Sequence, residues 1–398
     1  MLAVSEYLVE TTRDISVLLI TGSPVIHQLR LPERLDYIKL PSLTRTAPDV
    51  YCAKTLGTNI DETMRLRSDL ILAAAANFRP DLVLVDKKPC GVKNELTRTL
   101  EWLKSETSAR VALVLRDILD SPESTIPVWQ SQGYSERIIS SYDKVFVLGD
   151  PQIFDPRLEY AFPRAVSAKT VFCGYLGKRR AVGSRASVRE QLGVAPDERL
   201  IVVTAGGGED GHPIVKTYCA ALSEIHRLGR IRSLIITGPE MPPLQRDMIS
   251  STTAGNPRVA CRMFVENMMA YMEAADLVVS MGGYNTVCEL LSTGKRSVVI
   301  PRAEPVAEQW IRAERMAHLG LFSVIHPREL TPATLTEAVA AELDGTGKSG
   351  RAVQLPDLKA LANISRCCSR LLPDYTDCVE FMAGATTAYG YAQRIGIE

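Results

Sequence analysis

The sequence predicts an α/β protein built from two doubly wound domains, each a parallel sheet with helices on both faces. The chain has 398 residues, which exceeds the length at which a single hydrophobic core usually stops growing. Short apolar, β-branched runs alternate with helical patterns, as is typical of βαβ units and parallel sheets. Glycines and the run Lys178-Arg179-Arg180 interrupt this alternation once, within residues 174–197.

The first half of the chain supplies one of the two sheets. Its predicted strands are apolar almost throughout, as expected when helices cover both faces of a sheet. Helical patterns separate some of them, at residues 60–77 and 95–105. The predicted strands are residues 15–21, 37–40, 82–86, 111–115, 144–148 and 170–173.

The second half repeats the arrangement after the interruption. Its predicted strands are residues 200–204, 233–237, 259–262, 277–280, 297–300 and 322–325. Helices are predicted at residues 215–228, 268–275, 286–291, 308–317 and about 357–371. We therefore expect an N-terminal domain over residues 1–173, a linker over 174–197, a second domain over 198–372 and a tail of unknown role over 373–398.

Composition and charge argue against several classes of protein. Lys plus Arg and Asp plus Glu both number 46, whereas nucleic-acid-binding domains usually carry a basic excess. No apolar run reaches the roughly 18 residues that a membrane-spanning helix needs, and the N-terminus lacks the pattern of a secretion signal. The nine cysteines include no C-x-x-C pair, which is typical of reduced thiols rather than disulfides or a zinc site. We therefore expect a cytoplasmic protein without a transmembrane segment or a nucleic-acid partner.

Glycines follow the predicted strand at residues 200–204, in the run Gly206-Gly207-Gly208. Glycines between a strand and a helix let backbone N–H groups approach a phosphate, and the helix N-terminus adds partial positive charge. The run does not match the P-loop, because His212 follows Gly211 where that motif has a lysine. The alternative is a tight turn in which glycine only supplies the required backbone angles.

A second pair of glycines, Gly282-Gly283, follows the predicted strand at residues 277–280 and precedes Asn285, Thr286 and Glu289. Asn285 or Thr286 can cap the next helix, and Thr286 with Glu289 has the spacing of a capping box. In the functional interpretation, Glu289 lies in the first helical turn and accepts hydrogen bonds from a ribose diol, as the acidic residue of dinucleotide folds does. Both interpretations stay open at this point.

A polar pair, Glu308-Gln309, opens the helix that follows the predicted strand at residues 297–300. This pair is able to hydrogen-bond sugar hydroxyls; alternatively, Glu308 only complements the helix dipole. Ligands of doubly wound sheets bind at the C-terminal ends of strands. The three strand ends together therefore predict one ligand site in the second half of the chain.

Residues 200–340 resemble the C-terminal domain of family 28 glycosyltransferases, whose GT-B fold has two Rossmann-like domains facing across a cleft. The family includes the enzyme that adds N-acetylglucosamine to lipid-linked peptidoglycan precursors. Residues 16–24 and 79–86 look like the N-terminal domain of an uncharacterised branch of that group. The resemblance rests on Gly206-Gly207-Gly208, Arg262-Met263-Phe264-Val265, Ser280-Met281-Gly282-Gly283, Glu289, Pro301 and Glu308-Gln309.

The resemblance implies that these residues bind a nucleotide-sugar donor, a UDP-sugar, which is a co-substrate rather than a cofactor. Glu289 would hold the ribose, and Glu308 with Gln309 would hold the sugar. Val265 would meet the base through its backbone, with Phe264 packed nearby. The backbone N–H groups of Gly206, Gly207, Gly208, Gly282 and Gly283 would contact the diphosphate, and Asn285 and Thr286 complete the predicted set.

The sequence departs from the peptidoglycan enzyme next to the phosphate loops. Tyr284, Asn285 and Thr286 replace smaller residues. Glu209-Asp210 adds acid beside the first glycine loop, where unpaired negative charge would repel a diphosphate. We therefore expect these two carboxylates to point away or to pair with a base.

The resemblance also implies inverting transfer without a metal, to an unknown acceptor that is lipid-linked or part of a polysaccharide. A general base must face the donor carbon. The candidates are Asp117, after the strand at residues 111–115, and Asp86, which ends the strand at 82–86. Asp117 can instead form a salt bridge with Arg116 or cap its loop. A sugar-nucleotide epimerase or hydrolase, and a binding protein without turnover, remain alternative functions.

The sequence predicts that the N-terminal domain lacks its first strand. Residues 1–12 are predicted to form a helix, whereas a doubly wound domain normally opens with a strand in the middle of its sheet. The strands at residues 15–21 and 82–86 should then flank a vacancy. The sheet must close up, be filled by another segment such as residues 373–398, or be incomplete. A chain that begins upstream of Met1 is the simplest explanation, and a degenerate binding protein is the alternative.

Overall fold

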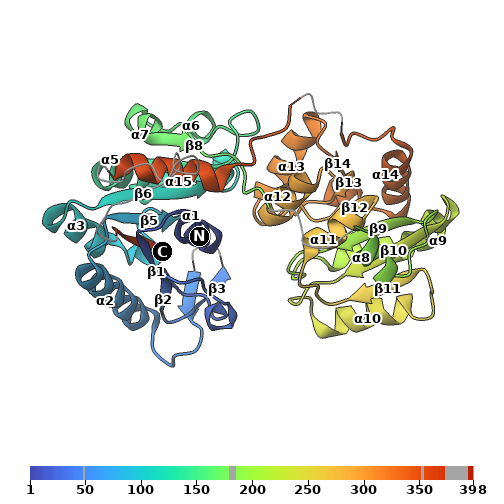
Figure 1. Cartoon of the computed structure of the whole chain (residues 1–398), viewed down its shortest axis with the longest axis horizontal. Coiled ribbons are helices and arrows are strands. Elements are labelled where there is room, and N and C mark those ends of the chain that lie inside the picture. The colour runs from blue at the N-terminus through green and yellow to red at the C-terminus, as the bar shows by residue number, and fades with distance from the viewer. Residues whose placement is uncertain (48–49, 179–184, 351–353, 373–392, 398) are drawn as a thin grey trace.

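The protein consists of two α/β halves that lie side by side, each with one parallel sheet (Figure 1). The computed structural model describes residues 1–47, 50–178, 185–350, 354–372 and 393–397. The predicted class of two doubly wound α/β domains is confirmed by the two sheets and by the helices that cover them.

The N-terminal sheet has seven parallel strands in the order β2-β1-β15-β5-β6-β7-β8. Its middle strands are apolar because helices cover both faces, and Leu82, Leu84 and Leu113 have no exposed surface. Its strands are β1 (Ile15–Thr21), β2 (Leu35–Lys39), β5 (Leu82–Asp86), β6 (Arg110–Arg116), β7 (Lys144–Leu148), β8 (Thr170–Phe172) and β15 (Gln393–Ile397). Its helices are α1 (Leu2–Thr11), α2 (Ile60–Phe78), α3 (Thr97–Glu106), α4 (Pro122–Ser131), α5 (Tyr134–Ser141), α6 (Pro156–Glu159) and α7 (Arg164–Lys169).

The C-terminal sheet has six parallel strands in the order β11-β10-β9-β12-β13-β14. The order reverses between β9 and β12, which is where ligands of doubly wound sheets bind. Its strands are β9 (Arg199–Thr204), β10 (Ile231–Ile236), β11 (Val259–Arg262), β12 (Leu277–Ser280), β13 (Ser297–Val299) and β14 (Ser323–Val324). Its helices are α8 (Arg185–Gln191), α9 (His212–Arg227), α10 (Pro243–Thr253), α11 (Met268–Ala274), α12 (Tyr284–Thr293), α13 (Glu308–His318) and α14 (Pro332–Asp344).

A small antiparallel hairpin, β3 (Leu43–Ala47) with β4 (Val50–Ala53), was not predicted. It follows β2 and precedes α2 in the chain. Asn59 begins α2 by accepting a hydrogen bond from the backbone N–H of Glu62 at 2.8 Å, and Arg79 ends it in the left-handed conformation.

The middle of the N-terminal sheet is occupied by β15, close to the C-terminus of the chain. Residues Ile15–Leu19 of β1 pair with Gln393–Ile397 on one side, and Leu82–Leu84 of β5 pair with Ile395–Ile397 on the other. Both ladders are parallel. The vacancy expected between the strands at residues 15–21 and 82–86 is therefore filled from the range 373–398, and residues 373–392 and 398 lie outside the described part of the chain.

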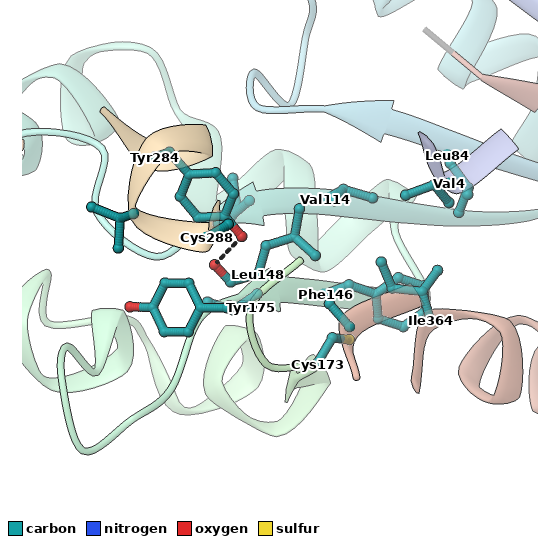
Figure 2. Close-up of a cluster of buried hydrophobic side chains, with 14 of the residues drawn as sticks. Val4, Leu84, Val114, Phe146, Leu148, Cys173, Tyr175, Tyr284, Cys288 and Ile364 are labelled. Atoms are coloured by element: carbon teal, nitrogen blue, oxygen red, sulfur yellow. Dashed lines mark hydrogen bonds between the residues drawn. The ribbon is translucent and has the colours of Figure 1, made fainter. Parts of the chain in front are cut away.

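The chain returns to the N-terminal half before β15, through α15 (Ala360–Leu371). The backbone N–H of Tyr175 donates to the carbonyl of Asp357 at 2.7 Å. Ile364 is buried in one core cluster with Phe146 and Cys173 of the N-terminal half (Figure 2). The predicted second domain over residues 198–372 is thus wrong at its end, because the apolar face of α15 packs against the other half.

The predicted linker over residues 174–197 is shorter than expected. Its second part forms α8, whose Arg185 and Arg189 bind the carboxylate of Asp276 at 2.5 and 2.9 Å. Asp276 also accepts a hydrogen bond from the backbone N–H of Leu200 at 2.7 Å, so α8 belongs to the C-terminal half. Residues 179–184 of the predicted linker lie outside the described residues.

Candidate functional site

A cavity of about 460 Å³ opens at the C-terminal ends of β9 and β12, where the strand order reverses. Most of the predicted donor-binding residues line it, because parallel strands end at the same edge of the sheet. The predicted residues that line it are Gly206, Gly207, Gly208, Gly283, Asn285, Thr286, Glu289, Glu308 and Gln309. The others that line it are Arg116, Thr204, Ala205, Glu209, Asp210, Glu240, Met268, Met281 and Tyr284.

The first glycine loop makes a tight turn between β9 and α9. Gly206 and Gly208 have positive φ angles of 65° and 100°, a region that favours glycine. A Cβ atom on Gly208 would lie 2.4 Å from the carbonyl oxygen of Thr237. The predicted turn geometry is therefore present, and it does not exclude phosphate binding. The helix that follows begins after Gly211 without a side-chain cap, so its first N–H groups have no side-chain acceptor there.

The second glycine turn also leads into a helix without a side-chain cap. Gly283 is the N-cap of α12, and Asn285 and Thr286 lie within its first turn. The capping interpretations of Asn285, Thr286 and the Thr286–Glu289 pair are therefore wrong, because the helix begins earlier than predicted. Two uncapped helix N-termini thus follow the glycine turns of one cavity, an arrangement that favours an anion.

Glu289 lies in the second turn of α12 rather than the first, and it lines the cavity. Burial raises the pKa of its carboxyl group, and the positive charge of Lys178 opposes this effect. With the capping box excluded, a ligand hydroxyl is the remaining proposed partner for this half-buried carboxylate.

The polar pair at the start of α13 has partners within the protein. The Glu308 carboxylate accepts a hydrogen bond from Nη2 of Arg312 at 3.0 Å. The side-chain oxygen of Gln309 accepts one from the backbone N–H of Arg302 at 3.2 Å. Glu308 is also the acidic residue in the first turn of its helix, so it complements the helix dipole while it lines the cavity.

The acidic residues beside the first glycine loop are partly neutralised. Asp210 forms an ion pair with Arg302 at 2.9 Å, which is the pairing with a base that the sequence led us to expect. Glu209 is exposed and lines the cavity together with Glu240, whose backbone N–H donates to the carbonyl of Gly207 at 2.8 Å.

Three predicted donor-binding residues do not line the cavity. Phe264 and Val265 lie in the loop after β11, where Phe264 is 60% exposed and Val265 is buried. Gly282 has a packing role, because a Cβ atom there would lie 3.1 Å from Cβ of Pro301. Its carbonyl oxygen accepts a hydrogen bond from Nη1 of Arg312 at 3.3 Å.

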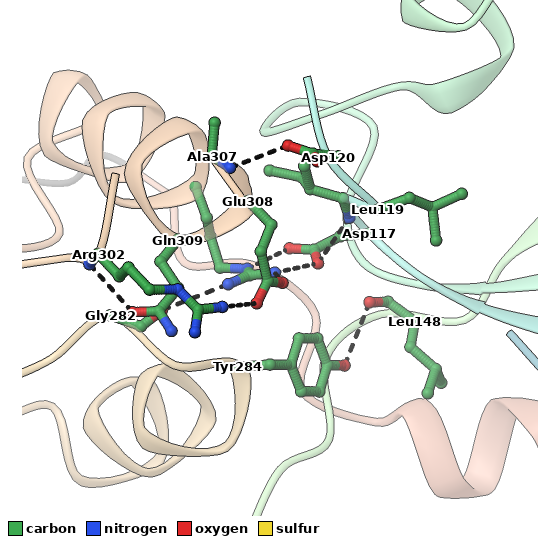
Figure 3. Close-up of polar contacts among 12 residues, drawn as sticks. Asp117, Leu119, Asp120, Leu148, Gly282, Tyr284, Arg302, Ala307, Glu308 and Gln309 are labelled. Atoms are coloured by element: carbon green, nitrogen blue, oxygen red, sulfur yellow. Dashed lines mark hydrogen bonds and ion pairs between the residues drawn. The ribbon is translucent and has the colours of Figure 1, made fainter. Parts of the chain in front are cut away.

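Asp117 lies in the contact between the two halves and does not line the cavity at the ends of β9 and β12. Its carboxylate binds Arg312 through two hydrogen bonds of 2.8 and 2.9 Å, and neither side chain is exposed. The hydroxyl of Tyr175 donates to the same carboxylate at 2.8 Å (Figure 3 shows the residues around this pair). Asp117 cannot reach an acceptor hydroxyl in this arrangement, so the structure contradicts its prediction as general base. Of the two predicted alternatives, the bridge to Arg116 is wrong because Arg312 is the partner. The loop cap is present, because the backbone N–H of Ile118 donates to Oδ1 of Asp117 at 2.8 Å.

Further contacts join the two halves next to this ion pair. The hydroxyl of Tyr284 in α12 donates to the carbonyl of Leu148 in β7 at 3.1 Å. The backbone N–H of Ala307 donates to the carboxylate of Asp120 at 2.9 Å (Figure 3). The halves therefore meet through hydrogen bonds and ion pairs beside the candidate donor cavity.

Asp86 ends β5 and lines a second cavity, of about 450 Å³, in the N-terminal half. Asp86 is exposed, and Asp120, Lys87, Lys88 and Trp129 line the same cavity. Val306 of the C-terminal half also lines it. Asp120 was not predicted as a site residue, although it lies only three residues after Asp117.

Known proteins with similar sequences are glycosyltransferases. Residues 201–349 match the glycosyltransferase family 28 C-terminal domain. An uncharacterized glycosyltransferase of Methanopyrus kandleri is 25% identical over 285 residues, which are 71% of this chain and 76% of that protein. A UDP-N-acetylglucosamine–N-acetylmuramyl-(pentapeptide) pyrophosphoryl-undecaprenol N-acetylglucosamine transferase of Exiguobacterium sp. is 29% identical over 184 residues, 45% of this chain and about half (49%) of that protein.

Solved structures share the fold of most of the chain. The MurG protein of Acinetobacter baumannii has a TM-score of 0.59 at 14% identity, and the alignment covers 93% of this chain and 94% of that one. A putative UDP-N-acetylglucosamine 2-epimerase from Listeria monocytogenes has a TM-score of 0.57 at 14% identity, covering 92% and 98% of the two chains. The fold alone therefore does not separate transferases from epimerases.

The protein belongs to the GT-B class, with two Rossmann-like domains. Its residues 201–349 match the C-terminal domain of glycosyltransferase family 28, and the chain is a glycosyltransferase similar in sequence to the Methanopyrus kandleri and Exiguobacterium proteins. No helix within the described ranges has the length and hydropathy needed to cross a membrane.

Proposed function

We propose that the protein transfers a sugar from a UDP-sugar to an acceptor hydroxyl, with inversion at the anomeric carbon and without a metal ion. The observation that carries this proposal is the convergence of two glycine turns and two uncapped helix N-termini on a cavity that also holds Glu289. Backbone N–H groups would bind the diphosphate there, and Glu289 would accept hydrogen bonds from the ribose.

The acceptor would enter through the cavity of the N-terminal half. Asp86 is the proposed general base because it is exposed, ends β5 and lines that cavity, whereas Asp117 is buried and paired. A lipid-linked sugar is the first class of acceptor to test, since the related Exiguobacterium enzyme acts on a pyrophosphoryl-undecaprenol substrate.

A cytoplasmic location remains the prediction from the cysteine pattern.

A donor screen by thermal shift tests the proposal. A ligand at 100 times its dissociation constant should stabilise the protein by about 2.7 kcal/mol. We expect UDP and UDP-sugars to raise the melting temperature, and Glu289→Ala to reduce this effect without loss of fold. Glu224→Ala is the control, because Glu224 is exposed, pairs with Arg227 and does not line the cavity.

The products decide between the proposed transfer and its rivals. Transfer requires sugar attached to an added acceptor, whereas free sugar or an epimerised donor without an acceptor would identify a hydrolase or epimerase. The third outcome is donor binding without turnover on any of a panel of lipid-linked and polysaccharide acceptors. It would identify the protein as a binding protein rather than an enzyme. Failure of all nucleoside diphosphates to bind would refute the donor assignment itself.

A further inference from the structure

Arg116 reaches the candidate donor cavity from the opposite half of the molecule. It is the last residue of β6 in the N-terminal sheet, and it lines the cavity built by the C-terminal strand ends. Its guanidinium carbon lies 5.4 Å from the ring centroid of Tyr284, the first residue of α12. The next residue, Asp117, points instead into the buried pair with Arg312, as expected for successive side chains at a strand end.

Arg116 lies in a cavity whose other charged side chains are all acidic. Arg116 is the only cationic side chain among the described residues that line the cavity, whereas five carboxylates line it. Within the described ranges the guanidinium of Arg116 forms no hydrogen bond or ion pair and contacts the ring of Tyr284, although it is an exposed cation beside five carboxylates. Arginine in such a place ordinarily pairs with a carboxylate. The five carboxylates are Glu209, Asp210, Glu240, Glu289 and Glu308.

Two of these carboxylates are already held by another arginine. Arg302 binds Asp210 at 2.9 Å and approaches Glu308 at 4.0 Å. Arg302 is therefore occupied, and Arg116 remains available for a ligand. An anionic ligand in this cavity would meet the uncapped N-termini of α9 and α12 from one half and Arg116 from the other.

We propose that Arg116 binds the diphosphate of the donor across the domain interface and neutralises the leaving group. This inference rests on the proposed function. During transfer the bond from the anomeric carbon to the diphosphate oxygen breaks, and its electron pair stays on that oxygen. The acceptor oxygen bonds to the anomeric carbon, and its proton goes to the general base. Arg116 keeps its own protons and donates stronger hydrogen bonds as negative charge develops.

The alternative is a purely structural role, in which Arg116 only stacks on Tyr284 and supports the contact between the halves. The two roles differ in what they do to ligands. If the role is structural, substitution of Arg116 should lower the affinity of every ligand of the cavity equally, or of none. A diphosphate-binding role would weaken only ligands that carry phosphate.

The experiment compares the affinities of UDP and uridine for wild type, Arg116→Ala and Arg116→Lys by calorimetry. We expect Arg116→Ala to weaken UDP about tenfold or more, as for loss of a hydrogen bond to a charged group, and to leave uridine unchanged. Arg116→Lys should recover part of the UDP affinity. Arg110→Ala is the matched control, because Arg110 lies at the other end of β6 and pairs with Asp143 in an exposed ion pair.

Equal UDP affinity in wild type and Arg116→Ala would overturn the inference, and so would an equal loss for UDP and uridine. If wild type bound no nucleoside diphosphate at all, the proposed function would fail first and the inference with it. Melting temperatures of all variants show whether a loss comes from unfolding. In turnover assays kcat should fall by more than KM rises, since the developing charge is greatest in the transition state.

Discussion

The carboxylate of Asp117 and the guanidinium of Arg312 form a doubly hydrogen-bonded ion pair, completely buried, between the two halves of the protein. The residues are 195 positions apart in the sequence. Burial by itself would lower the pKa of Arg312, but the nearby charge of Asp117 holds it above its ordinary value. Arg312 therefore remains charged, and the pair joins the halves next to the candidate donor cavity.

Loss of this ion pair should destabilise the protein strongly. We expect Asp117→Asn to lower the free energy of unfolding by about 3–5 kcal/mol, because the buried guanidinium of Arg312 loses its doubly hydrogen-bonded carboxylate and keeps only Glu308 as an anionic partner. Urea unfolding followed by circular dichroism measures the change. Asp69→Asn is the control: the Asp69–Arg98 pair is more than half exposed on both sides, and its loss should cost at most about 1 kcal/mol.

The double variant Asp117→Leu with Arg312→Met separates pairing from packing. We expect it to be more stable than the sum of its single variants predicts, because neither charge is left alone. Additive effects of the two substitutions would contradict a coupled pair.

Glu289→Gln should stabilise the ligand-free protein while weakening donor binding. Burial raises the pKa of Glu289, so the folded state binds a proton more tightly than the unfolded chain does. Such a group contributes stability that is present below its unfolded pKa and lost as pH rises through its folded pKa. At neutral pH the ionised carboxylate therefore costs stability, and the neutral amide avoids that cost.

Melting temperature and UDP affinity, each followed from about pH 7.5 to pH 4.5, test this prediction. The stability advantage of Glu289→Gln should shrink as the pH falls. The UDP affinity of wild type should fall over the same range, because a protonated carboxyl group accepts fewer hydrogen bonds. A variant whose stability and affinity both match wild type throughout would count against the ribose assignment.

Asp86→Asn should reduce turnover while leaving donor affinity intact. General-base catalysis contributes about 10²–10⁴-fold, and an amide cannot accept the acceptor proton. The measurement is kcat for transfer, with calorimetric UDP affinity in parallel. Asp69→Asn again serves as the exposed control, and a variant with wild-type kcat would exclude Asp86 as the base.

Replacement of Gln393–Ile397 by a Gly-Ser sequence should open the N-terminal sheet. The pairing of β1 and β5 with β15 would be lost, and each buried backbone group left unpaired costs about 1–3 kcal/mol. Hydrogen exchange should accelerate in Ile15–Leu19 and Leu82–Leu84. The amides of β9 and β12 in the other sheet are the internal reference. Unchanged exchange in β1 and β5 would show that another segment fills this position.

Much of the architecture could be predicted because strands covered on both faces are continuous apolar runs. The strands Leu82–Asp86, Lys144–Leu148, Val259–Arg262 and Leu277–Ser280 have the predicted bounds. The hairpin of β3 and β4 was missed because its short strands lack such a run. The glycine turns could be located from the sequence as well, since the backbone of a tight strand-to-helix turn favours glycine.

The sequence by itself determined the two parallel sheets, the glycine turns after β9 and β12 and the family resemblance of the C-terminal half, because these depend on local patterns of a few residues. Only the tertiary structure decided that Asp117 forms an ion pair with Arg312 while Arg116, its neighbour, lines the candidate donor cavity. It also placed β15 between β1 and β5 and α15 on the N-terminal half. These contacts join residues that are far apart in the chain. A local sequence pattern does not specify which distant residue will contact the end of a given strand.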